Sequence, residues 1–340
     1  MRVFTDYDQF ADAIGALSGR FIPTAPSQAD WWINARRVGG VKLQQLQIGG
    51  PAAFAGDGIL GMLSIGIPIS DPTAISINGQ TLAADSFVVY RPGRPLTYCA
   101  KVPTTWACVG LSLAPDSRFP GIMEFATASP LQAHFRSRHS VLRRVSLLVR
   151  WLCNDPEAID ARNQQAVFVA EQDVLAAVME LLRTSTCARG AIIGRPRLAR
   201  DRLMARCLEV LREQAPQPIQ VMDLCGAAQV SERTLRSVFI EYFGVGPGRF
   251  LKAHQLYEIR RALRTSDTGS ETVSSIAARF GVWDFGAFAR NYRAMYGESP
   301  SETLRLARAR AVDDDDELAA AAAQSWMGFA ARCFDADVST

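Results

Sequence analysis

The spacing of hydrophobic and polar positions changes along this chain and predicts an order of elements. Apolar residues within 6–18 recur at intervals of three and four, which indicates a short helix. From about 41 to 113, short apolar runs alternate with turns rich in Gly, Pro, Asp and Asn. Short strands at such spacing are typical of a β-sandwich or a β-barrel.

Two turns inside the strand region can be assigned from residue types. Asn78-Gly79 separates two apolar runs and predicts a tight hairpin, because both residues tolerate positive φ. Tyr90-Arg-Pro-Gly93 ends another run and predicts a second turn. These turns favour antiparallel strands.

The pattern becomes helical after the strand region, roughly over 131–152 and 160–183. Residues 184–197 are rich in Gly and Pro and form the natural linker. The segment 137–152 has one apolar face, which could form a dimer interface or pack on the protein's own strands. That face consists of Val141, Leu142, Val145, Leu148 and Leu152.

Beyond the linker, the chain is helical and contains an internal repeat. The run 230–247 is echoed by 282–300, and each copy ends in an aromatic residue followed by Gly-x-x-Pro. Each copy also follows a short helical segment with small residues, 222–229 and 273–280. The sequence therefore predicts two copies of one helical unit.

Each copy has the pattern of a helix-turn-helix, in which small residues let two helices cross closely. Ser231 and Asp284 are the expected N-caps of the two second helices. Apolar spacing turns Leu235 and Phe239 inward in the first copy, and Phe288 and Tyr292 inward in the second. The outward positions left for DNA are Glu232, Arg233, Arg236 and Ser237 in the first copy, and Phe285, Gly286, Ala287, Ala289, Arg290 and Arg293 in the second.

Charge is unevenly distributed, although the formal net charge is only +3. Residues 195–312 carry 19 basic and 12 acidic side chains, whereas 313–340 carry 1 and 7. Only 3 of the 37 basic residues are lysines, and arginine suits phosphate and base-edge contacts. The basic segment could also be an ordinary solvated surface, and the tail either a solvated cap or a mimic of DNA.

With these motifs in place, residues of about 200–308 resemble the DNA-binding domain of the AraC/XylS family of bacterial transcription regulators. The resemblance rests on LCGAAQVSERTLRSVFIEYFGVGPGRFL and on IAARFGVWDFGAFARNYRAMYGESPSETL. It implies seven helices, with two recognition helices entering successive major grooves. The base-contacting positions that it implies are Arg233, Arg236 and Ser237, then Phe285, Gly286, Ala287 and Arg290. Ser237 departs from a frequent arginine, and Gly286-Ala287 offers no polar side chain, so the second helix is expected to add phosphate anchoring and shape readout.

The order of elements also matches the family, and we therefore expect an α+β protein. It would have a cupin-like β-barrel domain over 1–130, a helical dimerisation segment over 131–183 and a linker over 184–197. An all-α tandem helix-turn-helix domain over 198–312 and an acidic, alanine-rich tail over 313–340 would follow. The barrel is expected to bind a small effector through aromatic and basic side chains, unless these simply fill the core. The candidates are Trp31, Trp32, Tyr90, Arg91, Arg94, Tyr98 and Trp106.

Catalytic and metal chemistry is not expected. No histidine precedes His134, so a metal-binding cupin site cannot be assembled on the strands. The 7 cysteines include no C-x-x-C pair and fit neither zinc binding nor a disulfide framework. An enzyme fused to the DNA-binding domain, either a metal cupin or a methyl-accepting repair protein, is the rival class.

The expected protein is a cytoplasmic, ligand-responsive activator of transcription without a cofactor or a membrane segment. Its expected partners are double-stranded promoter DNA, a small-molecule effector, RNA polymerase and a second copy of the chain. An alternative effector is a cyclic dinucleotide bound by the arginines of 136–150 and 189–202, because guanidinium groups pair with phosphates and stack on bases.

Overall fold

The computed structural model describes residues 1–113, 133–160, 162–187, 197–213, 217–266 and 271–309. The chain divides into two compact units, Met1–Gln214 with Ile219–His254, and Ala215–Pro218 with Gln255–Thr340. None of the described helices is long and apolar enough to cross a membrane. The predicted tail over 313–340 and most of the predicted linker over 184–197 lie outside the described residues. The domain boundaries stay a prediction.

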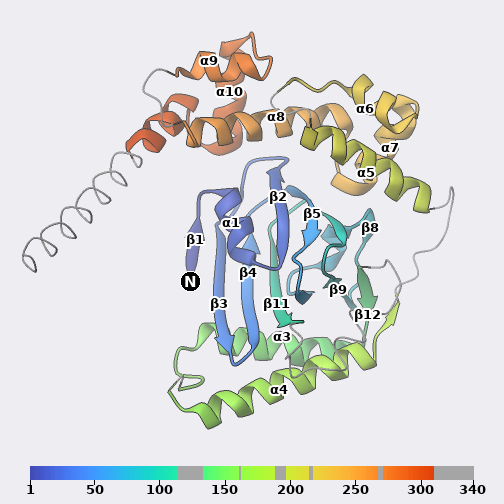
Figure 1. The fold of residues 1–340 in the computed structure, drawn as a ribbon, viewed down its shortest axis with the longest axis vertical. Coiled ribbons are helices and arrows are strands. Elements are labelled where there is room, and N and C mark those ends of the chain that lie inside the picture. Colours follow the sequence, from blue (N-terminus) through green and yellow to red (C-terminus); the bar gives the residue numbers. More distant parts are fainter. Residues whose placement is uncertain (114–132, 161, 188–196, 214–216, 267–270, 310–340) are drawn as a thin grey trace, which may run out of the picture. The chain divides into compact units, whose positions relative to one another are not determined.

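Two antiparallel sheets form the amino-terminal part of the first unit (Figure 1). The larger sheet has the order β1-β3-β4-β11-β6-β9-β12-β13, and the smaller has the order β2-β5-β10-β7-β8. The strands of the larger sheet are β1 (Arg2–Phe4), β3 (Trp31–Val38), β4 (Val41–Ile48), β6 (Met62–Pro68), β9 (Ser86–Tyr90), β11 (Thr104–Ser112), β12 (His134–Arg136) and β13 (Thr186–Cys187). Those of the smaller sheet are β2 (Leu17–Pro23), β5 (Ala52–Gly58), β7 (Ile75–Ile77), β8 (Gln80–Thr81) and β10 (Pro95–Ala100).

The α+β fold class is confirmed, but the two sheets do not close into a barrel. The order of each described sheet ends in an edge strand, β1 and β13 in one and β2 and β8 in the other. Closure would require hydrogen bonds between such edge strands. The cupin-like barrel expected from the sequence is therefore an open pair of sheets.

The core of the larger sheet lies on the face covered by α3 (His139–Asn154) and α4 (Gln164–Arg183), which lie side by side in Figure 1. Alternation along the strands sends every second residue to this face, as in Leu43, Ile65 and Val109, all at most 1% exposed. The predicted inward face of 137–152 contributes Val141, Leu142, Val145 and Leu152 to this core.

Arg36 on β3 fixes the end of α3 to the sheet. Its guanidinium donates hydrogen bonds to four backbone carbonyl oxygens, which belong to Leu152 (3.0 Å), Asp155 (2.7 Å), Pro156 (3.3 Å) and Ile159 (2.6 Å). Carbonyls at a helix end have no partners within the helix, and a positive charge there also interacts favourably with the helix dipole.

Local sequence signals explain the ends of several elements. α1 (Tyr7–Ile14) begins after Asp6, whose Oδ1 accepts the N–H of Asp8 at 2.8 Å, and ends at Gly15 with φ 58°. Asn78 (φ 47°) and Gly79 (φ 70°) form the tight turn between β7 and β8, as predicted.

The predicted start of the first long helix is wrong, because 134–136 forms the strand β12 rather than helix. Phe135 pairs with Phe87 of β9, and their rings stack with centroids 5.8 Å apart. His134, Phe135 and Arg136 together form a short strand that pairs with β9 and extends the larger sheet. The tertiary contact therefore overrides the local helical pattern.

Helices make up the rest of the described chain, as predicted. They are α5 (Arg197–Glu213), α6 (Val221–Ala228), α7 (Glu232–Phe243), α8 (Pro247–Arg264), α9 (Val273–Arg279) and α10 (Phe285–Tyr296), followed by a helical stretch over 300–309. One compact unit contains α5, α6 and α7, and the other contains α9 and α10, while α8 contributes residues to both.

Candidate DNA-binding surface

The pair α6–α7 forms the first helix-turn-helix. The turn is made by Gln229, which adopts the left-handed conformation (φ 53°), and by Val230, whose N–H donates to the carbonyl oxygen of Cys225. Ser231 caps α7, because its Oγ accepts the N–H of Thr234 at 3.3 Å. Leu235 and Phe239 are fully buried, so the side of α7 that they occupy is fixed against its neighbours.

The predicted base-contacting residues of α7 all lie on its free side. Arg233, Arg236 and Ser237 are exposed, as is Glu232. Within the described residues, neither Arg233 nor Arg236 forms an ion pair. Two free guanidinium groups in the first two turns of a capped helix can donate to base edges or phosphates.

The pair α9–α10 forms the second helix-turn-helix. Asp284 caps α10, since its Oδ1 accepts the N–H of Ala287 at 2.9 Å, and Phe288 and Tyr292 are buried as predicted. Phe285, Gly286, Arg290 and Arg293 are exposed, and Ala287 is half-buried. A Cβ on Gly286 would lie 3.6 Å from Nη1 of Arg290, so Arg290 reaches back toward the start of the helix.

The start of α10 also presents an apolar residue that the sequence analysis missed. Trp283 is 79% exposed, and Phe285 two positions later is 39% exposed. Trp283 directly precedes the N-cap and lies outside the spacing of the buried residues Phe288 and Tyr292, which was the available signal. Exposed apolar rings at this position can contact thymine methyl groups and sugars.

A partly buried polar network fixes the end of α10. The helix ends at Gly297 (φ 76°), and Oε1 of Glu298 lies 2.9 Å from Nη2 of Arg260 on α8. Thr303 Oγ1 lies 2.9 Å from the same carboxylate oxygen and 2.8 Å from the hydroxyl of Tyr292. The aromatic-Gly-Glu-Ser-Pro end of the repeat thus holds the carboxyl-terminal end of the second recognition helix in place.

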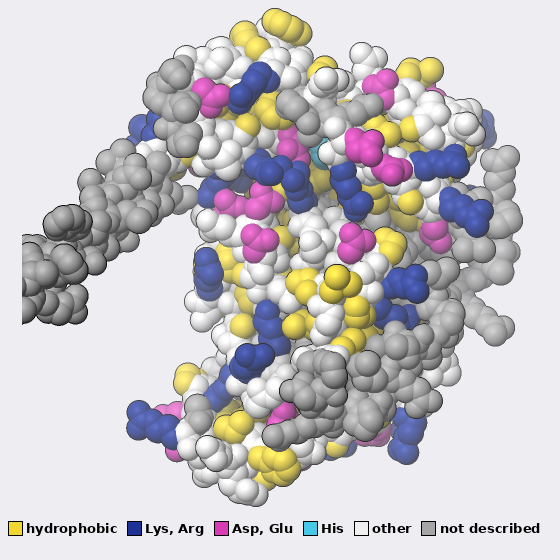
Figure 2. All heavy atoms as spheres, in the orientation of Figure 1, with side chains coloured by type: hydrophobic (Ala, Val, Ile, Leu, Met, Phe, Trp, Pro, Cys, Tyr) yellow, Lys and Arg dark blue, Asp and Glu magenta, His cyan; other side chains and the backbone are white. Residues whose placement is uncertain are grey.

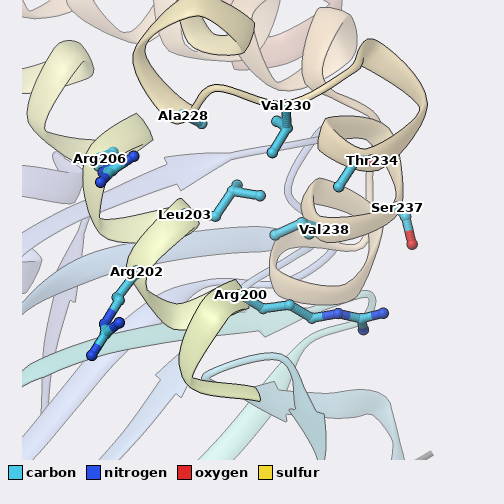
Figure 3. Close-up of a pocket in the computed structure, with 9 residues that line it drawn as sticks. All are labelled: Arg200, Arg202, Leu203, Arg206, Ala228, Val230, Thr234, Ser237 and Val238. Atoms are coloured by element: carbon cyan, nitrogen blue, oxygen red, sulfur yellow. The ribbon is translucent and has the colours of Figure 1, made fainter. Parts of the chain in front are cut away.

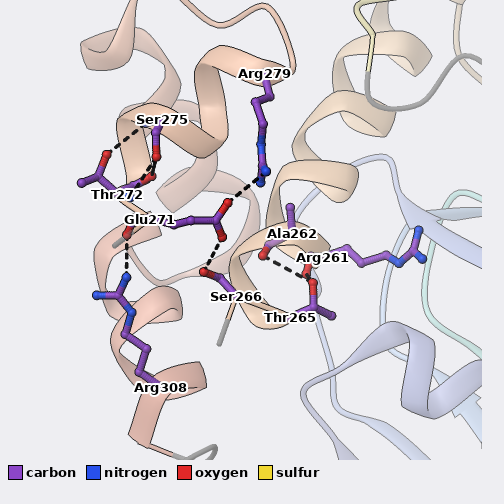
Figure 4. A network of polar contacts seen from close by, with 9 residues as sticks. All are labelled: Arg261, Ala262, Thr265, Ser266, Glu271, Thr272, Ser275, Arg279 and Arg308. Carbon is purple, nitrogen blue, oxygen red and sulfur yellow. Dashed lines mark hydrogen bonds and ion pairs between the residues drawn. The ribbon is translucent and has the colours of Figure 1, made fainter. Parts of the chain in front are cut away.

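A second network, around Glu271, holds the start of α9 (Figure 4). The carboxylate of Glu271 accepts from Ser266 Oγ at 2.7 Å and pairs with Arg279 at 2.9 Å. Thr272 caps α9 in a reciprocal arrangement with Ser275. Both helices of the second unit are therefore held at their starts by side-chain caps.

The structure brings together four of the predicted effector residues and separates the others. Rings of Trp31 and Tyr98 both approach Phe21, with centroids 5.7 and 6.1 Å away, and Tyr98 lies 6.1 Å from Trp106. A Cβ on Gly66 would lie 3.0 Å from Tyr90 and 3.3 Å from Trp106, so these rings also converge.

The remaining candidates, Trp32, Arg91 and the exposed Arg94, lie elsewhere. Trp32 follows Trp31 directly on β3 and therefore points to the opposite face of the sheet. The guanidinium of Arg91 lies 5.5 Å from the centroid of Phe135, over the helix-covered core. The four converging aromatic side chains come from both sheets. Trp31, Tyr90 and Trp106 belong to the larger sheet, and Tyr98 belongs to the smaller one.

The described thiols are poorly suited to nucleophilic chemistry. Burial raises the pKa of the Cys99 thiol to about 11 and that of Cys108 to about 12. Burial likewise raises the pKa of Cys207 to about 12. Few thiolates exist near neutral pH under these conditions. Across the described part of the chain, no group of three or more His, Cys, Asp or Glu side chains could hold a metal ion.

Comparison with known proteins finds relatives that are named as activators or regulators of operons. Residues 224–306 match the family described as a helix-turn-helix domain. The chain is 26% identical over 136 residues to XylDLEGF operon transcriptional activator 2 of Pseudomonas putida, covering 40% of this chain and 83% of that protein. It is 34% identical over 110 residues to the probable thc operon regulatory protein of Rhodococcus erythropolis, covering 32% of this chain and 33% of that protein. Matches to two further XylDLEGF operon activators span only 34% of their length.

Among solved structures, the chain is similar to a probable AraC family transcriptional regulator from Rhodopseudomonas palustris. The identity is 31%, the match covers 32% of this chain and 98% of that chain, and the TM-score is 0.29. Two capped helix-turn-helix units with exposed basic side chains define a DNA-binding regulator of transcription. This chain belongs to the AraC/XylS family of such regulators.

Proposed function

We propose that this protein activates transcription from specific promoters in response to a small-molecule effector. Sequence readout is assigned to Arg233, Arg236 and Ser237 on α7, and to Phe285, Gly286, Ala287, Arg290 and Arg293 on α10. The observation that carries the proposal is the pair of free arginines on the open side of capped α7. RNA polymerase is the proposed partner at the promoter, because several relatives are named as operon activators.

The readout by α7 is tested with Arg236→Ala in the full chain, measured by fluorescence anisotropy on operator and mutated-operator duplexes. Loss of a bidentate guanine contact costs about 1–3 kcal/mol and relaxes discrimination at one base pair. Arg212→Ala on α5 is the matched control, because it removes the same charge from an exposed position outside the recognition helix. Equal affinity and equal sequence preference in the two variants would show that α7 is not the reading helix.

The electrostatic part of binding is tested by salt. Arginine contacts to phosphates release counterions, so the affinity of the wild type should fall steeply between about 50 and 200 mM salt. A flat affinity over this range contradicts DNA binding through these basic helices. Run-off transcription with purified RNA polymerase then distinguishes activation from repression.

The effector is proposed to bind between the two sheets, beside Trp31, Tyr90, Tyr98 and Trp106. A thermal-shift screen of the full chain with aromatic acids, amines, fatty acids and cyclic dinucleotides identifies its class. Compounds that stabilise the protein are then added to the DNA-binding assay, because an effector must bind one conformational state better than another. Stabilising compounds that never change DNA affinity would contradict ligand control.

A homodimer through α3 and α4 is also part of the proposal. Apolar side chains remain at the surface over α4, where Figure 2 shows them among charged ones, and they continue onto α3. They are Leu147 and Trp151 on α3, and Phe168, Val169 and Met179 on α4. Trp151→Glu should give monomers in sedimentation velocity, whereas Trp283→Glu, at a still more exposed tryptophan just before α10, should not.

A further inference from the structure

A run of acidic residues follows closely after the last described helical turn. Residues 313–317 read Asp-Asp-Asp-Asp-Glu, and they lie outside the described residues. The described chain ends at Ala309, in the helical stretch over 300–309. Each residue of a fully extended chain adds at most about 3.6 Å. The acidic run 313–317 therefore begins within about 14 Å of the end of that helical stretch.

The helical stretch over 300–309 is fixed to the second recognition helix, α10. Oγ1 of Thr303 lies 2.8 Å from the hydroxyl of Tyr292 on α10, and both residues are buried. The stretch, α10 and the acidic run all belong to the same compact unit. The acidic run is therefore tethered to a helix that packs directly on α10.

The surface of α10 and of this stretch presents more positive than negative charge. Arg290 and Arg293 are exposed and lie three positions apart on α10, and within the described residues neither forms an ion pair. Hydrogen bonds from Ser299 lower the pKa of Glu302. The positive charges of Arg293 and Arg305 lower it further, so two arginines share this exposed carboxylate. The arginines of this surface can therefore accept additional carboxylates.

We propose that the acidic run 313–317 binds Arg290 and Arg293 when no DNA is present, and so competes with operator DNA for α10. Carboxylates pair with guanidinium groups as phosphates do, so DNA and the acidic run can bind the same side chains. Both are negatively charged and repel each other, so only one of them occupies this face at a time. The competition rests on the proposed DNA binding by α10, whereas the contact itself does not.

The short tether makes individually weak contacts effective. An exposed ion pair contributes little by itself, but a linked segment has an effective concentration in the millimolar range. Consecutive carboxylates also repel one another, and nearby guanidinium groups relieve this repulsion. The Debye length falls from about 10 Å at 0.1 M salt to about 3 Å at 1 M. The contact should therefore be strong at low salt and disappear as salt is added.

The competition is tested by neutralising the acidic run in the full chain and measuring operator binding by fluorescence anisotropy. The neutralised variant is Asp313→Asn/Asp314→Asn/Asp315→Asn/Asp316→Asn. It should bind at least about tenfold more tightly than the wild type at about 50 mM salt, and within about twofold of it near 0.3 M.

The matched control neutralises four exposed acids elsewhere and changes the net charge equally. It is Asp12→Asn/Asp30→Asn/Glu157→Gln/Asp173→Asn. This control leaves the acidic run in place, so we expect its affinity for operator DNA to rise by less than about threefold at about 50 mM salt. Circular dichroism checks that both variants are folded.

The contact is tested without DNA, by nuclear magnetic resonance of the arginine side chains at about pH 6, where aspartates are charged. The Nε–Hε signals of Arg290 and Arg293, assigned with single Lys variants, should differ between the wild type and the neutralised variant at about 50 mM salt. They should coincide near about 0.3 M salt. Arg202 is the internal control, because it is exposed on α5 and its side chain points away from Leu203 and Val238 (Figure 3). Its signal should be the same in both proteins.

The outcomes separate the contact, the competition and the proposed function. Equal signals of Arg290 and Arg293 in the two proteins overturn the contact, and equal affinity gains in the neutralised variant and the matched control overturn the competition. A signal difference that appears only as protein concentration rises assigns the acidic run to a second copy, which overturns a contact within one chain. Shifted signals without any operator binding overturn only the proposed function.

Discussion

Replacing Glu298 by glutamine should loosen the second recognition helix without touching its DNA-facing side. Glu298 pairs with Arg260, and their side chains are only 25% and 8% exposed. Removing one partner of a fully buried ion pair costs about 3–5 kcal/mol. Glutamine keeps an acceptor for Thr303, and part of the carboxylate lies in water, so we expect a loss of about 2 kcal/mol.

Native-state hydrogen exchange of the α10 amides measures this loss locally, and 2 kcal/mol corresponds to about 30-fold faster exchange. Glu302→Gln is the matched control, because Glu302 is exposed and its contact is a capping box with Ser299, which glutamine also forms. We expect a change of less than about 0.5 kcal/mol for that variant. Equal exchange rates in the two variants would refute the stabilisation of α10 by the Glu298–Arg260 pair.

Three further substitutions test other parts of the structure. Arg36→Ala should lower the free energy of unfolding of the first compact unit by about 2–4 kcal/mol in urea titrations, because four backbone carbonyls lose a charged donor. Arg37→Ala, at an exposed neighbouring position, should change it by less than about 0.5 kcal/mol. Trp283→Ala should keep the melting temperature, because the side chain is exposed, and weaken specific DNA binding about tenfold, because its ring is placed to contact thymine methyl groups; unchanged binding would refute that contact. The guanidinium of Arg136 hydrogen-bonds to Asp85 and lowers the pKa of its carboxyl group. The pair therefore contributes its full stabilisation above the ordinary aspartate pKa of about 4. This stabilisation is lost as the pH falls through the lowered pKa of Asp85 in the folded protein. Asp85→Asn should remove this acid-dependent part from pH-dependent melting curves, and identical curves for variant and wild type would contradict it.

Much of the fold could be predicted because local chemistry determines it. The strands between 41 and 113, the Asn78-Gly79 turn and the caps Ser231 and Asp284 each follow from residue type and spacing. β5 (Ala52–Gly58) was harder to predict from the sequence, because small residues that allow another backbone to approach closely stand where alternating apolar and polar residues would indicate a strand. A Cβ on Gly56 would lie 2.3 Å from the carbonyl oxygen of Ser18 on the neighbouring strand.

The recognition helices were more predictable than the effector residues for a physical reason. Helical spacing assigns an inner and an outer side, so exposure of Arg233 and Arg236 follows from burial of Leu235 and Phe239. Which aromatics meet between two sheets depends instead on strand order and register. Trp31 and Trp32 are equal candidates in sequence, but adjacent residues of a strand point to opposite faces.

The two recognition helices differ in chemistry, and this difference has a consequence for the operator. α7 presents arginines that can discriminate guanine through paired hydrogen bonds, whereas the start of α10 presents Trp283, Phe285 and a glycine. Apolar rings contact thymine methyl groups, and Arg290 reaches back over Gly286, where it can pair with a phosphate or a base. Base discrimination by hydrogen bonds should therefore concentrate in the half of the operator bound by α7. The half bound by α10 should tolerate changes that preserve a thymine methyl or the groove shape, because these are the features that its side chains can detect.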